Sequence, residues 1–234
     1  MKRIFPLLTV FCLACSTASA LDIAALERAM ENPDRPTAEK DRDASRQAPA
    51  VLDFLGLEAG MTALDVNAST GWYTEVLSYA VGPNGKVFMQ NRPGGRAEEA
   101  ANAKAARLSN IEQVAAITDV AANSVDFAII GLNLHDFHNA DPARAQGILA
   151  QVLGVLKPGG ILGVIDHEGN SGADNASLHR IAFDDAVKAL LQAGFVLAGA
   201  SDILDNPADA HDLHQSDPSL GRSTDRIVLQ LIKL

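Results

Sequence analysis

The chain has 234 residues, 47% of them hydrophobic, and a formal net charge of −10, which suits one folded domain. The acidic excess argues against nucleic acid and anionic lipid surfaces as partners, because both attract Lys and Arg. Both cysteines, Cys12 and Cys15, lie within the first 20 residues, so residues 21–234 can form neither a disulfide nor a thiolate site.

Residues 1–20 have the three parts of a secretory signal peptide. A basic start precedes an apolar run over residues 4–14, and an Ala-Ser-Ala cleavage site follows at 18–20. The apolar run is shorter than the roughly 20 residues of a membrane span. We therefore expect a periplasmic or secreted chain without stable membrane insertion, whose loss of two cations shifts the net charge from −10 to −12. A lipoprotein acylated at Cys15 is the second interpretation.

The first elements after this leader form an amino-terminal extension. Residues 22–31 carry apolar side chains at helical spacing, whereas the charged, proline-containing segment 32–48 is expected to be a solvated arm. The alternative is that Arg35, Asp41 and Arg46 of this segment fold back over the cleft. Residues 49–55 predict a helix that leads into the first strand of the sheet. We therefore divide the chain into a leader over 1–20, an amino-terminal helix and arm over 21–48, and a main domain over 49–234.

The stretch 63–91 is the most informative part of the chain. It predicts a strand at 63–66, a turn of small and polar residues at 67–71, a helix from Trp72, and a second strand at 86–89. Strand, turn, helix and strand make the first unit of a parallel α/β sheet, which binds ligands at the carboxyl ends of its strands. Small side chains let a ligand approach the backbone, and the helix N–H groups favour a carboxylate or phosphate.

The rest of the chain continues this alternation and ends in two strands that are expected to be antiparallel. Helices are predicted at 96–108, 141–156 and 177–194, and strands at 111–117, 125–131, 161–165, 195–201 and 226–233. The pattern predicts an α/β fold with about seven strands and helices on both faces. The segment 202–225 is longer than most connections and is a candidate lid.

Two motifs resemble those of the class I S-adenosylmethionine (SAM)-dependent methyltransferases. Asp65 through Gly71 is similar to their acidic residue followed by alternating glycines, with Asn67 and Ser69 in two glycine positions. The run Gly71–Glu75 is similar to a group of predicted methyltransferases, and helix, Leu-Lys-Pro-Gly-Gly, strand at 156–160 is the second motif. The resemblance covers residues 35–234 and implies a Rossmann-like sheet with a carboxy-terminal antiparallel hairpin.

The resemblance also implies SAM as the cofactor and a set of residues around it. Gln90 and Asn91 stand where relatives carry an acid for the ribose hydroxyls, and a neutral amide accepts a weaker hydrogen bond than a carboxylate. Asp119 matches the position beside the adenine, although a polar cap on the following turn explains it equally well. The predicted cofactor residues are Asp65, Asn67, Ser69, Gly71, Trp72, Gln90, Asn91, Asp119 and Asn133.

Three histidines are candidates for catalysis at the same edge of the sheet. His135 and His138 follow the fourth strand, in a loop where such enzymes place residues facing the methyl group, and His167 ends the fifth strand. Imidazoles there suit a general base, a metal site with Asp136, or structural hydrogen bonds. Arg180 is either a clamp for an anionic group or an exposed residue near a helix start.

The first hypothesis is therefore an exported SAM-dependent methyltransferase with an unknown small-molecule substrate. The alternatives are a non-catalytic small-molecule-binding protein on the same fold, which the two replaced glycines favour, and a metal-assisted hydrolase that uses the histidines. Fold alone does not decide among them. The oligomeric state is left open by the sequence.

Overall fold

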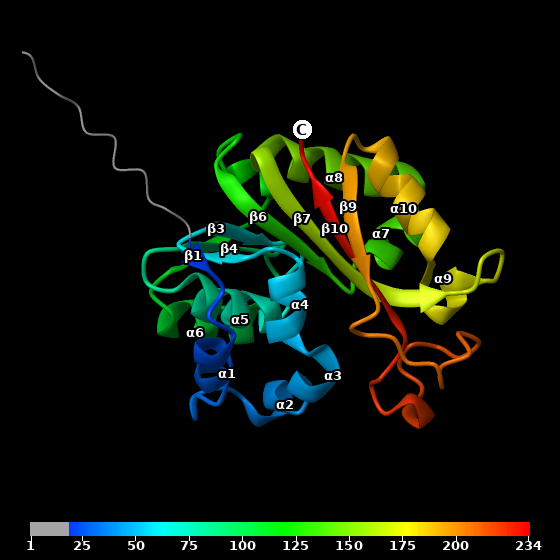
Figure 1. The fold of residues 1–234 in the computed structure, drawn as a ribbon, viewed down its shortest axis with the longest axis horizontal. Coiled ribbons are helices and arrows are strands. Elements are labelled where there is room, and N and C mark those ends of the chain that lie inside the picture. The colour runs from blue at the N-terminus through cyan, green and yellow to red at the C-terminus, as the bar shows by residue number, and fades with distance from the viewer. Residues whose placement is uncertain (1–18) are drawn as a thin grey trace, which may run out of the picture.

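One twisted sheet organises the computed structural model, which describes residues 19–234 (Figure 1). Its strands run in the order β5-β4-β3-β6-β7-β10-β9, with β8 paired to β7 to make eight. The predicted signal peptide, with both cysteines, lies outside the described residues apart from its last two positions. Across residues 19–234, none of the helices has the length and apolar content needed to cross a bilayer.

The sheet confirms the predicted fold class, including the carboxy-terminal antiparallel strands. Its members are β3 (Thr62–Asp65), β4 (Lys86–Gln90), β5 (Ile111–Val114), β6 (Val125–Gly131), β7 (Leu156–Gly169), β8 (Ile181–Ala182), β9 (Val196–Ser201) and β10 (Arg226–Ile232). Strands β3 to β7 are mutually parallel, whereas β10 runs antiparallel to both β7 and β9. A separate two-stranded sheet joins β1 (Ser19–Ala20) to β2 (Glu58–Ala59).

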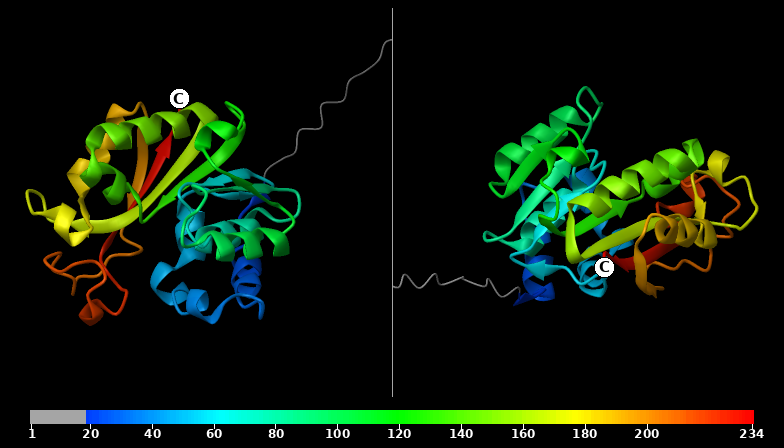
Figure 2. Two further views of the ribbon diagram at one scale, coloured as in Figure 1. Left: turned by 180° about the vertical axis from the view of Figure 1, so that it is seen from behind. Right: turned by 90° about the horizontal axis from the view of Figure 1, so that it is seen from above.

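Helices cover both faces of the sheet, as the Rossmann-like pattern requires (Figure 2). One face carries α1 (Ile23–Met30), α4 (Ala48–Phe54) and α5 (Trp72–Val81), and α6 (Glu98–Arg107) lies beside α5. The other face carries α7 (Leu134–Ala140), α8 (Pro142–Val155) and α10 (Phe183–Gln192). Each face buries its own apolar cluster, so the carboxyl ends of the strands stay free for a site.

The arm over residues 32–48 is only partly solvated and packs on the domain through a few buried side chains, which corrects the expectation of a solvated arm. It forms α2 (Thr37–Lys40) and α3 (Asp43–Arg46) and buries two charged side chains, Arg35 and Glu39. Arg35 donates to the carboxylate of Asp43 at 2.5 Å, and Lys104 donates to Glu39 at 2.6 Å. Buried charges persist when they are paired. Asp43 lies within the same arm as Arg35, whereas Lys104 is 65 positions from Glu39 and is missed by a local reading.

Two further segments differ from the prediction. Residues 133–139, expected to be a loop, form α7, because Leu134 and Phe137 fall on one face and are buried. The helix expected over 177–194 is broken into α9 (Asn175–Leu178), β8 and α10. His179 has a left-handed φ of 51°, which ends α9.

Candidate active site

The turn between β3 and α5 keeps the backbone of a glycine-rich turn without most of its glycines. Asn67, Ser69 and Gly71 have φ values of 53°, 54° and 79°, all in the left-handed region. That region costs a non-glycine residue about 1–2 kcal/mol, although Asn tolerates it better than most. The three alternating positions of the predicted motif therefore share the backbone conformation that glycine favours. The turn thus keeps the shape of the glycine-rich motif even where glycine is replaced.

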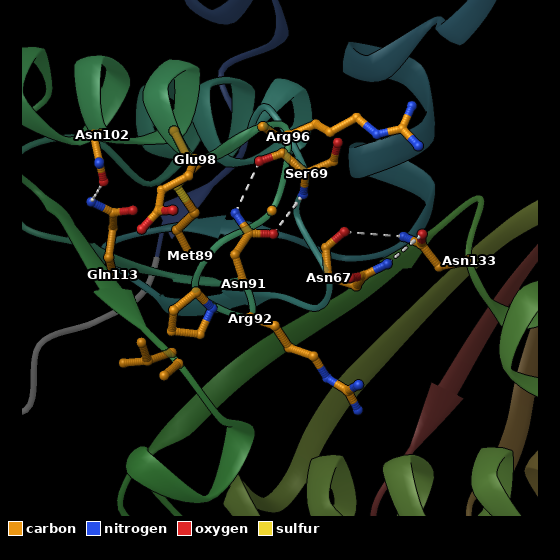
Figure 3. A pocket seen from close by; sticks show the side chains of 16 residues that line it. Asn67, Ser69, Met89, Asn91, Arg92, Arg96, Glu98, Asn102, Gln113 and Asn133 are labelled. Carbon is orange, nitrogen blue, oxygen red and sulfur yellow. Dashed lines mark hydrogen bonds between the residues drawn. The ribbon is translucent and has the colours of Figure 1, made fainter.

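Gln90 and Asn91, at the end of β4, hold this turn in place. The N–H of Asn67 donates to Gln90 Oε1 at 2.9 Å, and the N–H of Ser69 donates to Asn91 Oδ1 at 2.8 Å. Asn91 Nδ2 donates in return to the Ser69 carbonyl at 2.9 Å (Figure 3). The two amides at the predicted ribose position thus bond to the turn backbone in this structure.

A cavity of about 660 Å³ opens beside the turn at the ends of β4 and β5. Four of the predicted cofactor residues line it, namely Asn67, Ser69, Asn91 and Asn133 (Figure 3). Gly71 is not among the lining residues, and a Cβ there would clash with the terminal methyl of Met89, which does line the cavity. The volume falls within the roughly 300–1,000 Å³ of typical small-molecule sites.

A second, smaller cavity of about 170 Å³ adjoins the same turn on the β6 side. Asp65, Trp72 and Tyr73 line it together with the turn residues 67–70 and the end of β6. Burial raises the pKa of Asp65 to about 6, although Thr74 donates to its carboxylate at 2.6 Å. The Tyr73 hydroxyl is buried without a hydrogen-bond partner among the described residues. An orphaned buried hydroxyl is costly unless a ligand completes it.

The two remaining cofactor candidates, Gln90 and Asp119, line neither of these two cavities. Gln90 borders a further cavity of about 180 Å³, and its Nε2 donates to the Ala115 carbonyl at 3.0 Å. Asp119 ends a short 3₁₀ helix, and its carboxylate accepts the N–H of Ala116 at 2.8 Å. This bond closes the 3₁₀ helix before Asp119, so the carboxylate does not form the cap that was expected on the following turn.

His135 is held between two carboxylates. Its Nδ1 lies 2.6 Å from Asp166 Oδ1, and its Nε2 lies 3.2 Å from Asp136 Oδ1. Burial disfavours the imidazolium, but the two carboxylates outweigh it and raise the pKa of His135 to about 9. His135 is therefore a cation at neutral pH, with both ring nitrogens donating, and has no lone pair with which to take a proton.

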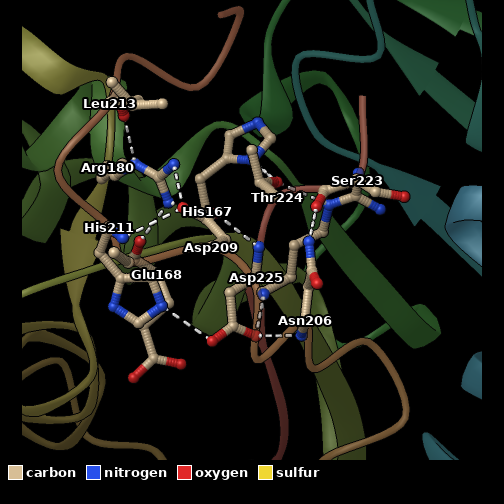
Figure 4. A network of polar contacts seen from close by, with 12 residues as sticks. His167, Glu168, Arg180, Asn206, Asp209, His211, Leu213, Ser223, Thr224 and Asp225 are labelled. Atoms are coloured by element: carbon tan, nitrogen blue, oxygen red, sulfur yellow. Dashed lines mark hydrogen bonds and ion pairs between the residues drawn. The ribbon is translucent and has the colours of Figure 1, made fainter. Parts of the chain in front are cut away.

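His167 is the neutral counterpart of His135. Its ring centroid lies 5.8 Å from that of His135, and its Nδ1 lies 2.6 Å from the Thr224 hydroxyl (Figure 4). Burial, followed by the positive charges of Arg226 and His135, lowers the pKa of His167 to about 2. The Nε2 atom of His167 forms no hydrogen bond within residues 19–234, and the side chain lines a cavity of about 570 Å³. His138, by contrast, borders none of the cavities described above.

A possible metal-ligand group occurs at the same edge. One ligand atom each from His135, Asp136 and His179 lie within 4.8 Å of one another. Because both nitrogens of His135 face carboxylates, the arrangement is that of an ion-paired imidazolium flanked by His179. Metal ligation needs a deprotonated imidazole nitrogen, so the group as it stands does not favour the hydrolase alternative.

Arg180 is a structural residue and is fully buried, which corrects both sequence-based readings of it. Its guanidinium pairs with Asp209 at 2.9 Å and donates to the carbonyls of Glu168 and Leu213 (Figure 4). The segment 202–225 is anchored to the sheet through these contacts. Its residues 215–222 lie close to α3, and both line the cavity that His167 borders.

Sequence reasoning missed several residues that shape the site. Asp166 accepts three hydrogen bonds, from the His135 backbone, the His135 ring and the His167 N–H, at 2.6–2.8 Å. The only available signal was an acid next to His167 at the end of a strand. Three arginines, Arg42, Arg222 and Arg226, line the cavity that His167 borders. They are separated by up to 184 positions in the sequence, so no local pattern joins them.

The comparisons with known proteins agree with this architecture. No family model matches the chain. A demethylmenaquinone methyltransferase of Shouchella clausii is 34% identical over 114 residues, which are 47% of this chain and 46% of that protein. The chain thus spans about half the length of the curated relatives that it matches.

Solved structures extend the likeness to nearly the whole fold. A SAM-dependent methyltransferase from Aquifex aeolicus matches with a TM-score of 0.63 and 20% identity, over 91% of this chain and 99% of that one. The cyclase SpnF matches with a TM-score of 0.60 and 21% identity, over 81% and 80% of the two chains. Sheet order, the β3–α5 turn and these matches together place the chain in the class I SAM-dependent methyltransferase fold.

Proposed function

We propose that the protein is a SAM-dependent methyltransferase that acts on a small-molecule acceptor. The observation that carries the proposal is the left-handed backbone of Asn67, Ser69 and Gly71 at the end of β3. The strand order reverses between β3 and β6, where open α/β sheets bind their ligands. The methyltransferase relatives support SAM as the cofactor.

The residues around the turn fit such a cofactor. Asn67, Ser69 and Asn133 line the larger cavity with side chains that both donate and accept hydrogen bonds. Tyr73 offers a buried hydroxyl that lacks a partner in the described part of the chain. Bound SAM supplies an electrophilic methyl group, and the protein contributes position and orientation.

Within this proposal His167 is the residue placed to receive the acceptor's proton. It is neutral, it borders the cavity next to the turn, and Thr224 fixes its ring through Nδ1. A pKa this low makes it a weak base in the free protein, so a bound anion near Arg226 has to raise that pKa for proton transfer to be efficient. Unchanged turnover in a His167→Gln variant would exclude this role.

Calorimetric titration of the full chain with SAM and S-adenosylhomocysteine tests the proposal. Wild type should bind both, and Asn67→Pro should weaken binding about tenfold or more, because proline fixes φ near −65° and removes the N–H that Gln90 accepts. Asn123→Pro is the matched control, since Asn123 has a φ of 54° in a turn away from the site. Equal loss in both variants, or no binding by wild type, would contradict the proposal, and the latter would favour the binding-protein alternative.

We also propose that the chain is exported and cleaved after Ala20, which leaves the amino-terminal helix and arm over 21–48 and the main domain over 49–234. The charged start, short apolar run and Ala-Ser-Ala end support this. Cleavage would remove β1 and leave α1 intact, because Asp22 caps α1 through the N–H of Ala25 at 2.9 Å. Mass spectrometry of the exported protein should give a chain that starts at Leu21. A mass that includes residues 1–20, or a lipid on Cys15, would refute it.

A further inference from the structure

Four arginines line a single cavity in a protein whose net charge is −10. Arg42 and Arg46 come from the arm around α3, Arg222 from the segment before β10, and Arg226 from the start of β10. The cavity has a volume of about 570 Å³ and is called the arginine pocket below. In Figure 1 the blue α3 and the orange-to-red segment 202–225 lie at the same end of the molecule.

The positive charge of the arginine pocket is largely unopposed. Among residues 19–234, no carboxylate lies within 4.0 Å of any of these four guanidinium groups. Asp217 is the acid on the pocket wall, and its Oδ1 already accepts the N–H and hydroxyl of Ser219 at 2.9 and 2.6 Å. His167, on the same wall, is neutral.

Two of these arginine side chains contact other parts of the protein, whereas the other two form no side-chain hydrogen bond among the described residues. Arg226 donates to the carbonyls of Ser45 and Arg222 at 2.5 and 2.6 Å, and Arg46 stacks over the Trp72 ring at 4.4 Å. The side chains of Arg42 and Arg222 form no hydrogen bond within the described residues. Both residues line the cavity, and their guanidinium donors have no protein acceptor within the described residues.

Like charges this close disfavour one another. Burial, and after it the charge of Arg42, lowers the pKa of Arg46, while burial and the charge of Arg46 lower the pKa of Arg226. An anion between them would convert this repulsion into attraction. Guanidinium groups are well suited to carboxylate and phosphate, since their planar donors match both in bidentate fashion.

The arginine pocket is continuous with the turn between β3 and α5. Arg42, Arg46 and Leu132 line both it and the 170 Å³ cavity that contains the turn residues 67–70. Tyr73, with its unpartnered buried hydroxyl, lies on the shared side and its ring packs under Arg46 at 5.1 Å. A molecule in the arginine pocket would thus sit between His167 and the turn.

We propose that the arginine pocket binds a small organic molecule through an oxyanion group, a carboxylate or a phosphate. The volume is larger than an inorganic ion requires and is in the range of small-molecule sites. The identification of this molecule as the methyl acceptor rests on the proposed function, whereas the binding itself does not. The substrate class is then an anionic metabolite, held at its charged end by Arg42, Arg46 and Arg222.

Two double variants of equal charge test the inference on the full-length chain. Arg42→Ala/Arg222→Ala removes two arginines of the arginine pocket, and Arg92→Ala/Arg96→Ala removes two that line the 660 Å³ cavity. Calorimetric titrations use inorganic phosphate and succinate as separate probes, at constant ionic strength set with NaCl, because charge effects are screened by salt. Thermal unfolding of each variant shows that the fold is kept.

Wild type should bind at least one probe, and the probe that binds identifies phosphate or carboxylate as the preferred group. Affinity should fall about tenfold or more in Arg42→Ala/Arg222→Ala and stay within about twofold in Arg92→Ala/Arg96→Ala. Binding of neither probe, equal loss in both variants, or loss confined to Arg92→Ala/Arg96→Ala would overturn the inference. Titration of SAM into the same samples separates the two proposals, since SAM binding without oxyanion binding defeats this one alone.

Discussion

Replacing Lys104 with Met should lower the free energy of unfolding by about 3–5 kcal/mol, the usual cost of breaking a buried ion pair from one side. Lys104 is 4% exposed and lies 2.6 Å from Glu39 and 3.0 Å from Glu75, both buried. It also donates to the Gly71 carbonyl at 3.0 Å. Met retains the apolar stem, so the loss reports the missing charge. Chemical denaturation measures it.

Lys86→Met is the matched control for this experiment. Lys86 pairs with Glu112 at the same 2.6 Å, but both side chains are about half exposed. Exposed pairs contribute about 0–1 kcal/mol, so the control should lose less than about 1 kcal/mol. If the two variants lost the same free energy, burial would not be what makes the Lys104 contacts strong.

Stability should fall by an amount on the order of 3 kcal/mol as the pH rises from about 6.5 to about 9, because of His135. The carboxylates of Asp136 and Asp166, acting against burial, raise the pKa of His135 to about 9 in the folded protein. A histidine whose pKa is raised on folding contributes fully to the free energy of unfolding at pH values below its pKa in the unfolded chain. This contribution disappears as the pH rises through its pKa in the folded protein. Urea unfolding across this range measures the change.

His135→Gln should remove this alkaline slope, and His138→Gln, on the same helix α7, should keep it. Burial lowers the pKa of His167 to about 2, so this residue destabilises the fold only below about pH 6.5. Its effect therefore falls outside the pH range in which His135 acts. A slope that survived in His135→Gln would show that another group carries the alkaline dependence.

The architecture was predictable because its signals are local. The strand predicted at 63–66 appears one residue earlier as β3, and the helix predicted from 141 appears as α8, capped by Asp141 with Pro142 at its first position. The strand predicted at 161–165 is longer than expected, because β7 begins at Leu156 and includes the Pro-Gly-Gly segment. Phe183 and Leu191, two large apolar residues of the helix predicted over 177–194, are 42% and 48% exposed, because α10 instead buries Ala186, Ala189 and Leu190. A helix face that is buried through alanines is hard to recognise in a sequence, because alanine is also common on exposed helix faces.

The site was less predictable because its contacts are long-range. The turn at 67–71 could be located, but not that Gln90 and Asn91 would bond to its backbone from 22 or 23 positions away. The arm looked solvated because the partners of Arg35 and Glu39 depend on how it folds back. The arginine pocket needs residues from both ends of the chain, and only the packing of α3 near β10 brings them together.

The contacts of Lys104 give the two walls of the arginine pocket different freedom to open. On the arm side, the buried ion pair to Glu39 ties α2 to α6 and to the turn, so the arm cannot lift without breaking it. On the opposite wall, residues 215–222 are linked mainly by short-range hydrogen bonds such as Ser219 to Asp217. Local opening is cheapest where buried contacts are few. We therefore expect the wall formed by residues 215–222, and not the arm, to open when a small molecule enters or leaves the pocket.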